Sequence, residues 1–249
     1  MLFRWFCLCV LLVYVGCNRL PPERLQTFQD AQSAFDAEEY RLSATLYQQL
    51  LDRGIHSGTV YYNLGNAWAK ADEPARAVAA YYHAKRYIPN DPYLIANFRT
   101  VLANNGGTML TLERSLVDYL FFWQNWLGVH TKIWSSLVLT GLTFGGGLLY
   151  LFRQSKRLKR CVVGLAMLTA IALTSVGYDW YRFDRIERII VTMSTLPRKG
   201  NSEQYEPALV TPISFGTPAI ILDERSGWYL LRFPSGQEGW IPQTQTFPM

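Results

Sequence analysis

Two long apolar stretches constrain the fold of this chain more than any other feature. The first, "IWSSLVLTGLTFGGGLLYLF", occupies residues 133–152, and the second, "CVVGLAMLTAIALTSVGYDW", occupies residues 161–180. Neither stretch carries a charge before Asp179, and a helix of about 20 residues matches the apolar thickness of a bilayer. Tyrosine and tryptophan lie near their ends, as in the aromatic belts of membrane proteins. The sequence therefore predicts two transmembrane helices.

The segment between these stretches, residues 153–160, is strongly basic. Its five cations equal the whole excess of 24 Lys and Arg over 19 Asp and Glu in the chain. They are Arg153, Lys156, Arg157, Lys159 and Arg160. A nucleic-acid-binding surface needs cations spread over a face or groove, so we expect no nucleic-acid partner. Short basic loops stay in the cytoplasm, where they contact anionic lipid headgroups. We therefore predict a cytoplasmic loop with both flanking parts of the chain outside.

The first residues have the pattern of a signal peptide. Arg4 precedes the apolar run "WFCLCVLLVYVG", which is too short to span a membrane comfortably. The run ends in Val15-Gly16-Cys17, which resembles the site where bacteria attach lipid to a cysteine, so Cys17 is a candidate for lipid attachment. An ordinary cleaved signal peptide and an uncleaved anchor are the alternatives. Residues 1–17 thus predict the bacterial inner membrane, with the soluble parts on the extracytoplasmic side.

Residues 24–106 have helical periodicity and repeat with a period of 34 residues. The segment 58–90, "GTVYYNLGNAWAKADEPARAVAAYYHAKRYIPN", matches the tetratricopeptide repeat (TPR) at Leu64-Gly65, Trp68, Tyr81 and Pro89. A weaker copy precedes it, with Ser43 where the repeat usually has alanine. The stretch after it begins a third repeat but has no second helix. We expect an all-α TPR solenoid closed by a capping helix.

Polar side chains recur at one position of these repeats. Gln29, Asn63 and Asn97 are spaced 34 residues apart, and Asn66 and Lys70 lie one and two turns along the same helix face as Asn63. On a concave solenoid face, such amides can bind the backbone of an extended peptide. The alternative is that the repeats are only a scaffold.

Residues 182–249 change to short β-rich runs separated by glycine, proline and serine. The pairs Gly227-Trp228 and Gly239-Trp240 resemble consecutive strands of the bacterial SH3 domain, a small five-stranded all-β barrel. Four aromatic side chains form either a surface for peptide or glycan, or part of the barrel core. They are Trp228, Tyr229, Phe233 and Trp240.

The remaining segment and the titratable residues point away from catalysis. Residues 112–130 are rich in tryptophan and phenylalanine, which predicts an amphipathic interfacial helix or a core helix docked on the repeats. The three histidines, His56, His83 and His130, are scattered, and no cysteine and histidine spacing suits zinc. We therefore expect no enzyme activity, cofactor or metal.

The order of these segments resembles the BatE-like members of the Bacteroides aerotolerance (Bat) family. The resemblance spans roughly residues 24–242 and implies a multidomain membrane protein with TPRs, a two-helix membrane hairpin and an SH3-like barrel. It also implies a non-enzymatic adaptor that works with von Willebrand factor A-type membrane proteins and a MoxR-type ATPase. In an alternative function, the SH3-like domain binds peptidoglycan of the cell wall and the TPRs act as a spacer.

Overall fold

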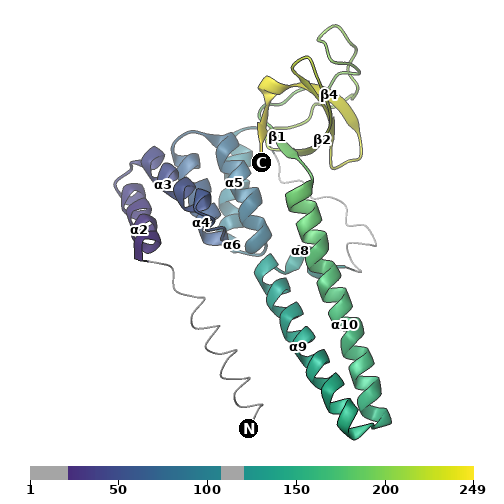
Figure 1. Cartoon of the computed structure of the whole chain (residues 1–249). Coiled ribbons are helices and arrows are strands. Elements are labelled where there is room, and N and C mark those ends of the chain that lie inside the picture. Colours follow the sequence, from purple (N-terminus) through teal and green to yellow (C-terminus); the bar gives the residue numbers. More distant parts are fainter. Residues whose placement is uncertain (1–21, 108–120) are drawn as a thin grey trace.

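The computed structural model describes residues 22–107 and 121–249. The predicted signal peptide, Cys17 and residues 112–120 of the predicted interfacial segment at 112–130 lie outside the described residues. The described chain has three parts: an array of helices, a long helical hairpin that projects away from it, and a small β-sheet domain (Figure 1). Helices together with a small antiparallel sheet, as the sequence predicts, are therefore present.

Five helices form the array at the N-terminal end of the described chain. They are α2 (Pro22–Asp36), α3 (Tyr40–Asp52), α4 (Gly58–Lys70), α5 (Pro74–Tyr87) and α6 (Pro92–Asn104). Each helix packs against the next one in the sequence. Ser57 and Asp91 start α4 and α6 by accepting hydrogen bonds from the main-chain N–H of Val60 and Leu94, as N-cap residues do.

The turns inside the helix pairs repeat in backbone geometry. Glu38 and Asp72, which are 34 residues apart, both have a left-handed backbone, with φ of 62° and 60°.

The helix contacts at Gly65 and Ser43 explain why the repeats have small residues at these two positions. A Cβ atom on Gly65 would collide with the ring of Tyr81, so only glycine allows α4 and α5 to approach this closely. Ser43 Oγ donates a 2.8 Å hydrogen bond to the main-chain oxygen of Ala31. The serine that departs from the repeat pattern therefore ties α3 to α2.

The hairpin consists of α9 (Val129–Arg153) and α10 (Lys156–Trp180). Both helices are long and apolar enough to cross a membrane. Only 6% and 11% of their most apolar windows are buried inside the protein, so neither is the core helix of a soluble domain. Large apolar side chains such as Phe144 and Phe152 are 68% and 86% exposed. The prediction of two membrane-length helices is therefore confirmed.

The basic segment between these helices differs from the predicted eight-residue loop. The turn consists only of Gln154, whose φ is 43°, and Ser155. The prediction of a loop over residues 153–160 is therefore wrong: Arg153 ends α9, and the other four cations lie in the first turns of α10. Lysine and arginine are good helix formers, so the helices continue through them, beyond the predicted spans 133–152 and 161–180.

A buried ion pair joins the two helices at the open end of the hairpin, away from the turn at Gln154 and Ser155. Lys132 Nζ lies 2.7 Å from Asp179 Oδ2, and their side chains are only 3% and 5% exposed. The same ammonium group donates to the main-chain oxygen of Gln124 at 2.7 Å and to its Oε1 at 2.9 Å. All three ammonium hydrogens are thus used. Gln124 belongs to the short helix α8 (Trp123–Trp126), which lies in segment 112–130 ahead of the first residues of α9.

The C-terminal domain is a five-stranded antiparallel sheet with the order β4-β3-β2-β1-β5. Its strands are β1 (Arg188–Val191), β2 (Pro218–Arg225), β3 (Trp228–Arg232), β4 (Glu238–Pro242) and β5 (Thr246–Pro248). Ser226 and Gly227 join β2 to β3 with φ of 49° and 79°, the positive values that a tight hairpin turn requires. The inner face of the sheet buries Ile189, Val191, Leu231 and Ile241.

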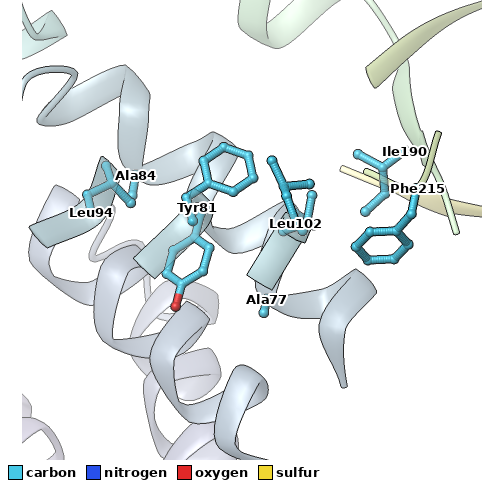
Figure 2. Close-up of a cluster of buried hydrophobic side chains, with 10 residues drawn as sticks. Ala77, Tyr81, Ala84, Leu94, Leu102, Ile190 and Phe215 are labelled. Carbon is cyan, nitrogen blue, oxygen red and sulfur yellow. The ribbon is translucent and has the colours of Figure 1, made fainter. Parts of the chain in front are cut away.

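The three parts of the chain share packing surfaces. Ile190 and Phe215 of the sheet domain are buried against the last repeat helices, next to Leu102 of α6 (Figure 2). Gly216 has φ of 76°, and a Cβ atom there would collide with Leu102. The main chain of Gly128, which precedes α9, packs equally closely on the main chain of Tyr87 at the end of α5. Helix α5 therefore contacts the other helices of the array, the sheet domain and the helical hairpin, so these parts are not independent modules.

Candidate functional site

The polar residues predicted to form a concave row lie on three helices of the array. Gln29 is on α2, Asn63, Asn66 and Lys70 are on α4, and Asn97 is on α6. Gln29 and Lys70 are exposed, whereas the three asparagines are half-buried. Half-buried amides need hydrogen-bond partners, so the contacts of the asparagines decide what this row can do.

Asn66 and Asn97 form one network with two tyrosines. Asn66 Oδ1 accepts hydrogen bonds from Tyr81 Oη at 2.8 Å and from Asn97 Nδ2 at 2.9 Å. Asn97 Nδ2 also donates to Tyr62 Oη at 3.0 Å. Burial raises the pKa of Tyr81 well above its usual range, so its hydroxyl stays protonated and acts as the donor. The network fixes the orientation of both amides and ties α4, α5 and α6 together.

Asn63 makes a separate contact, because its Nδ2 donates to Tyr47 Oη of α3 at 3.2 Å. Among the described residues, Gln29 and Lys70 form no hydrogen bond with any of these asparagines. The structure therefore joins two members of the predicted row in one network and leaves the other three outside it. The repeat pattern alone assigns no role to the hydroxyl groups of Tyr47 and Tyr81. The signal for their role was tyrosine at a position where the repeat usually has phenylalanine.

The amides of the network retain unused hydrogen-bonding groups. Asn66 Nδ2 makes no hydrogen bond to a described residue, and neither does Asn97 Oδ1. The first is a donor and the second an acceptor, and they belong to two amides that are hydrogen-bonded to each other. An extended peptide offers the complementary pair, a C=O and an N–H group. The geometry of Asn66 and Asn97 is therefore compatible with binding a peptide backbone.

The four aromatic residues of the sheet domain do not share a surface. Phe233 and Trp240 are 3% and 9% exposed, so they belong to the interior. Trp228 and Tyr229 are consecutive in β3 and half-buried. Their side chains point to opposite faces of the sheet, because successive residues in a strand alternate. Tyr229 packs against the sheet core. Of the two predicted roles for this set, the structure favours the core.

The histidines pack on tyrosine rings. His83 stacks on Tyr61 with ring centroids 5.0 Å apart, and His56 Nδ1 lies 2.9 Å from the same tyrosine's hydroxyl. The ring centroids of His130 and Tyr87 lie 5.1 Å apart. Within the described residues, no group of three histidine, cysteine, aspartate or glutamate side chains is placed to hold a metal ion.

No protein-family model matches the chain, and no curated protein matches it. Among solved structures, part of it is similar to the C-terminal SH3 domain of myosin IB from Entamoeba histolytica, which was solved with a bound peptide. The two share 20% sequence identity, with a TM-score of 0.19, and the match covers 26% of this chain and 93% of that chain.

Proposed function

We propose that this protein is a non-enzymatic, membrane-anchored adaptor that binds an extended segment of a partner protein along its helical repeats. The supporting observation is the pair Asn66 and Asn97, whose amides are fixed by internal hydrogen bonds while one donor and one acceptor remain unused. Fixed polar groups bind a backbone without first losing side-chain entropy. In this proposal the helical array is a TPR solenoid and the sheet domain is a bacterial SH3-like barrel that covers its last helices.

The proposed location is the bacterial inner membrane, with the repeats and the sheet domain on the extracytoplasmic side. Two features support this orientation. The five cations lie at the end of the hairpin that is remote from the sheet domain (Figure 1), and Lys/Arg-rich ends of membrane helices stay in the cytoplasm. The signal-peptide pattern of residues 1–17 predicts the same orientation independently.

The packing around α5 supports an adaptor for other membrane proteins. Asn90 Nδ2 donates to the main-chain oxygen of Trp126 at 2.7 Å, and Gly128 packs on Tyr87. The repeats are thereby held at a set height and angle relative to the hairpin. A partner with its own membrane anchor can reach such a surface by diffusion in the plane of the membrane. The resemblance to BatE-like proteins suggests von Willebrand factor A-type membrane proteins and a MoxR-type ATPase as the partners.

Co-purification from membranes of the source organism tests the proposal. The full-length tagged chain should retain a von Willebrand factor A-type membrane protein, and Asn97→Ala should lose it while still inserting into the membrane. Tyr62→Phe is the matched control, because it removes one of the two internal hydrogen bonds that Asn97→Ala removes but leaves the unused Oδ1 of Asn97 in place. The control should keep the partner.

Two results would contradict the proposal. Retention of the partner by the Asn97→Ala protein would show that the amide does not bind it. Equal loss in the Asn97→Ala and Tyr62→Phe proteins would show that these hydrogen bonds only hold the helices together, so the row would be structural.

A further inference from the structure

A cleft lies where the three parts of the chain meet. Helix α5, the ends of the membrane hairpin near α8, and strands of the sheet domain line a cavity of about 1390 Å³. Along its lining, α10 continues into a π-helical turn, Tyr181–Arg185, a widened turn that is frequent at functional sites. The cleft is separate from the polar row of Asn66 and Asn97, and neither residue lines it.

The described residues that line this cleft are strongly cationic. Seven lysine and arginine side chains line it, against the two carboxylates of Asp179 and Glu187. Two of these cations are neutralised, because Lys132 pairs with Asp179 and Arg232 pairs with Glu238, each at 2.7 Å. Four others form no ion pair with a carboxylate among the side chains that the structure describes. They are Lys85, Arg182, Arg185 and Arg188.

Three guanidinium groups crowd around one aromatic ring in the cleft. The guanidinium carbons of Arg86, Arg182 and Arg188 lie 5.0, 5.6 and 5.4 Å from the centre of the Phe183 ring. The ring attracts each cation, but the cations repel one another. Burial, followed by the charge of Arg182, lowers the pKa of both Lys85 and Arg188. An anion that entered the cleft would therefore stabilise the charged form of each of these groups.

The chemistry of the cleft favours phosphate. Guanidinium groups present parallel N–H donors that match two phosphate oxygens, and such charge-assisted pairs are the stronger hydrogen bonds of proteins. Its position favours a lipid as the source, because Lys132, Tyr178 and Arg182 lie at the ends of the two membrane-length helices. The guanidinium carbon of Arg185 also lies 4.9 Å from the ring centre of Trp180, and tryptophan is enriched at the depth of the headgroups.

We infer that this cleft binds the phosphodiester headgroup of an anionic phospholipid, such as phosphatidylglycerol. The inference rests on membrane insertion of the hairpin and not on the proposed peptide-binding row. A bound headgroup contacts α5 of the repeats, the end of α10 and the start of β1 at once. It therefore fixes the angle between the repeats and the membrane hairpin by cancelling charge that otherwise pushes these elements apart.

Lipid titration of the purified full-length protein in a neutral detergent tests this site. Phosphatidylglycerol should raise the melting temperature and bind at least about tenfold more tightly than phosphatidylcholine, which carries no net charge. Each cation near a headgroup is worth about 1 kcal/mol, so Arg182→Gln with Arg188→Gln should weaken binding about 30-fold. Arg53→Gln with Arg99→Gln is the matched control, since it removes two exposed arginines of the helical array that do not line the cleft and should leave this affinity unchanged.

Three outcomes would overturn the inference. Equal loss of affinity in the two double variants would mean that phosphatidylglycerol binds through net charge alone. A melting temperature that inorganic phosphate raises as much as the lipid would assign the cleft to a soluble anion. Equal affinity for the two lipids would remove the role of charge. If the Arg182→Gln, Arg188→Gln protein unfolds at a lower temperature without lipid, Lys85→Gln and Arg185→Gln each repeat the test, with an expected loss of about fivefold.

Discussion

The buried pair Lys132–Asp179 should contribute more to stability than any exposed ion pair of this protein. Asp179→Asn keeps the shape of the side chain but leaves the Lys132 ammonium, which is 3% exposed, without a counter-charge. Removing one partner of a buried pair costs about 3–5 kcal/mol. For a chain of this size, about 1 kcal/mol lowers the melting temperature by roughly 2–4 °C. We therefore expect a decrease on the order of 10 °C.

Thermal unfolding of the detergent-solubilised full chain measures this difference. Glu206→Gln is the matched control, because Lys199 and Glu206 are also 2.7 Å apart but are 59% and 80% exposed. Solvent screens such pairs, so the melting temperature of the control should be close to that of the wild type. The double variant Lys132→Met, Asp179→Leu removes both buried charges. It should recover most of the lost stability, since an apolar pair of similar volume can replace a buried ion pair.

The reasoning about this pair fails in either of two cases. If Asp179→Asn lowers the melting temperature no more than Glu206→Gln does, the pair is not buried in the working protein. If the double variant is as unstable as Asp179→Asn, the loss comes from packing or from the contacts to Gln124 and not from the uncompensated charge.

Three further predictions follow from the packing. Gly216→Ala should destabilise the protein and split its unfolding into two transitions, because the new Cβ collides at the contact between sheet and repeats. Gly236→Ala is the control, because Gly236 has a similar φ of 80° but open space around it, and this variant should unfold in a single transition. Burial, followed by the charge of Arg86, lowers the pKa of His83. Stability should therefore fall as the pH drops below about 6.5, and His83→Gln should flatten this dependence in melting curves. The full chain should not sediment with peptidoglycan; sedimentation that Trp228→Ala abolishes would favour the cell-wall function.

The helices of the repeats and the hairpin could be predicted from local patterns. The 34-residue spacing that ends in Asn97 places each polar residue on its helix, and the runs that begin at Ile133 and Cys161 are apolar enough to give membrane-length helices. The ends of those helices could not be predicted from the sequence. The low hydropathy of lysine and arginine suggests a loop, whereas their helix propensity extends α9 and α10. Local sequence holds both signals, and helix propensity prevails here.

The contacts between the three parts could not be predicted from the sequence. Phe215 and Ile190 pack on Leu102 across about a hundred residues, and nothing in the local pattern of an apolar residue identifies its partner. The cationic cleft has the same origin: the sequence shows two short basic groups, near residues 85 and 182–188, and only the docking of α5 on the hairpin brings them together. The unused amides of Asn66 and Asn97 also depend on tertiary hydrogen bonds.

Site-specific photo-crosslinking in living cells tests the proposed peptide-binding row most directly. A photoreactive phenylalanine derivative replaces Lys70, an exposed residue on the same helix as Asn66, and in a second strain it replaces Val210, which is 99% exposed on the sheet domain. We predict that the probe at position 70 crosslinks to a von Willebrand factor A-type membrane protein and that the probe at position 210 does not. No adduct at position 70, or the same adducts at both positions, would contradict the adaptor function.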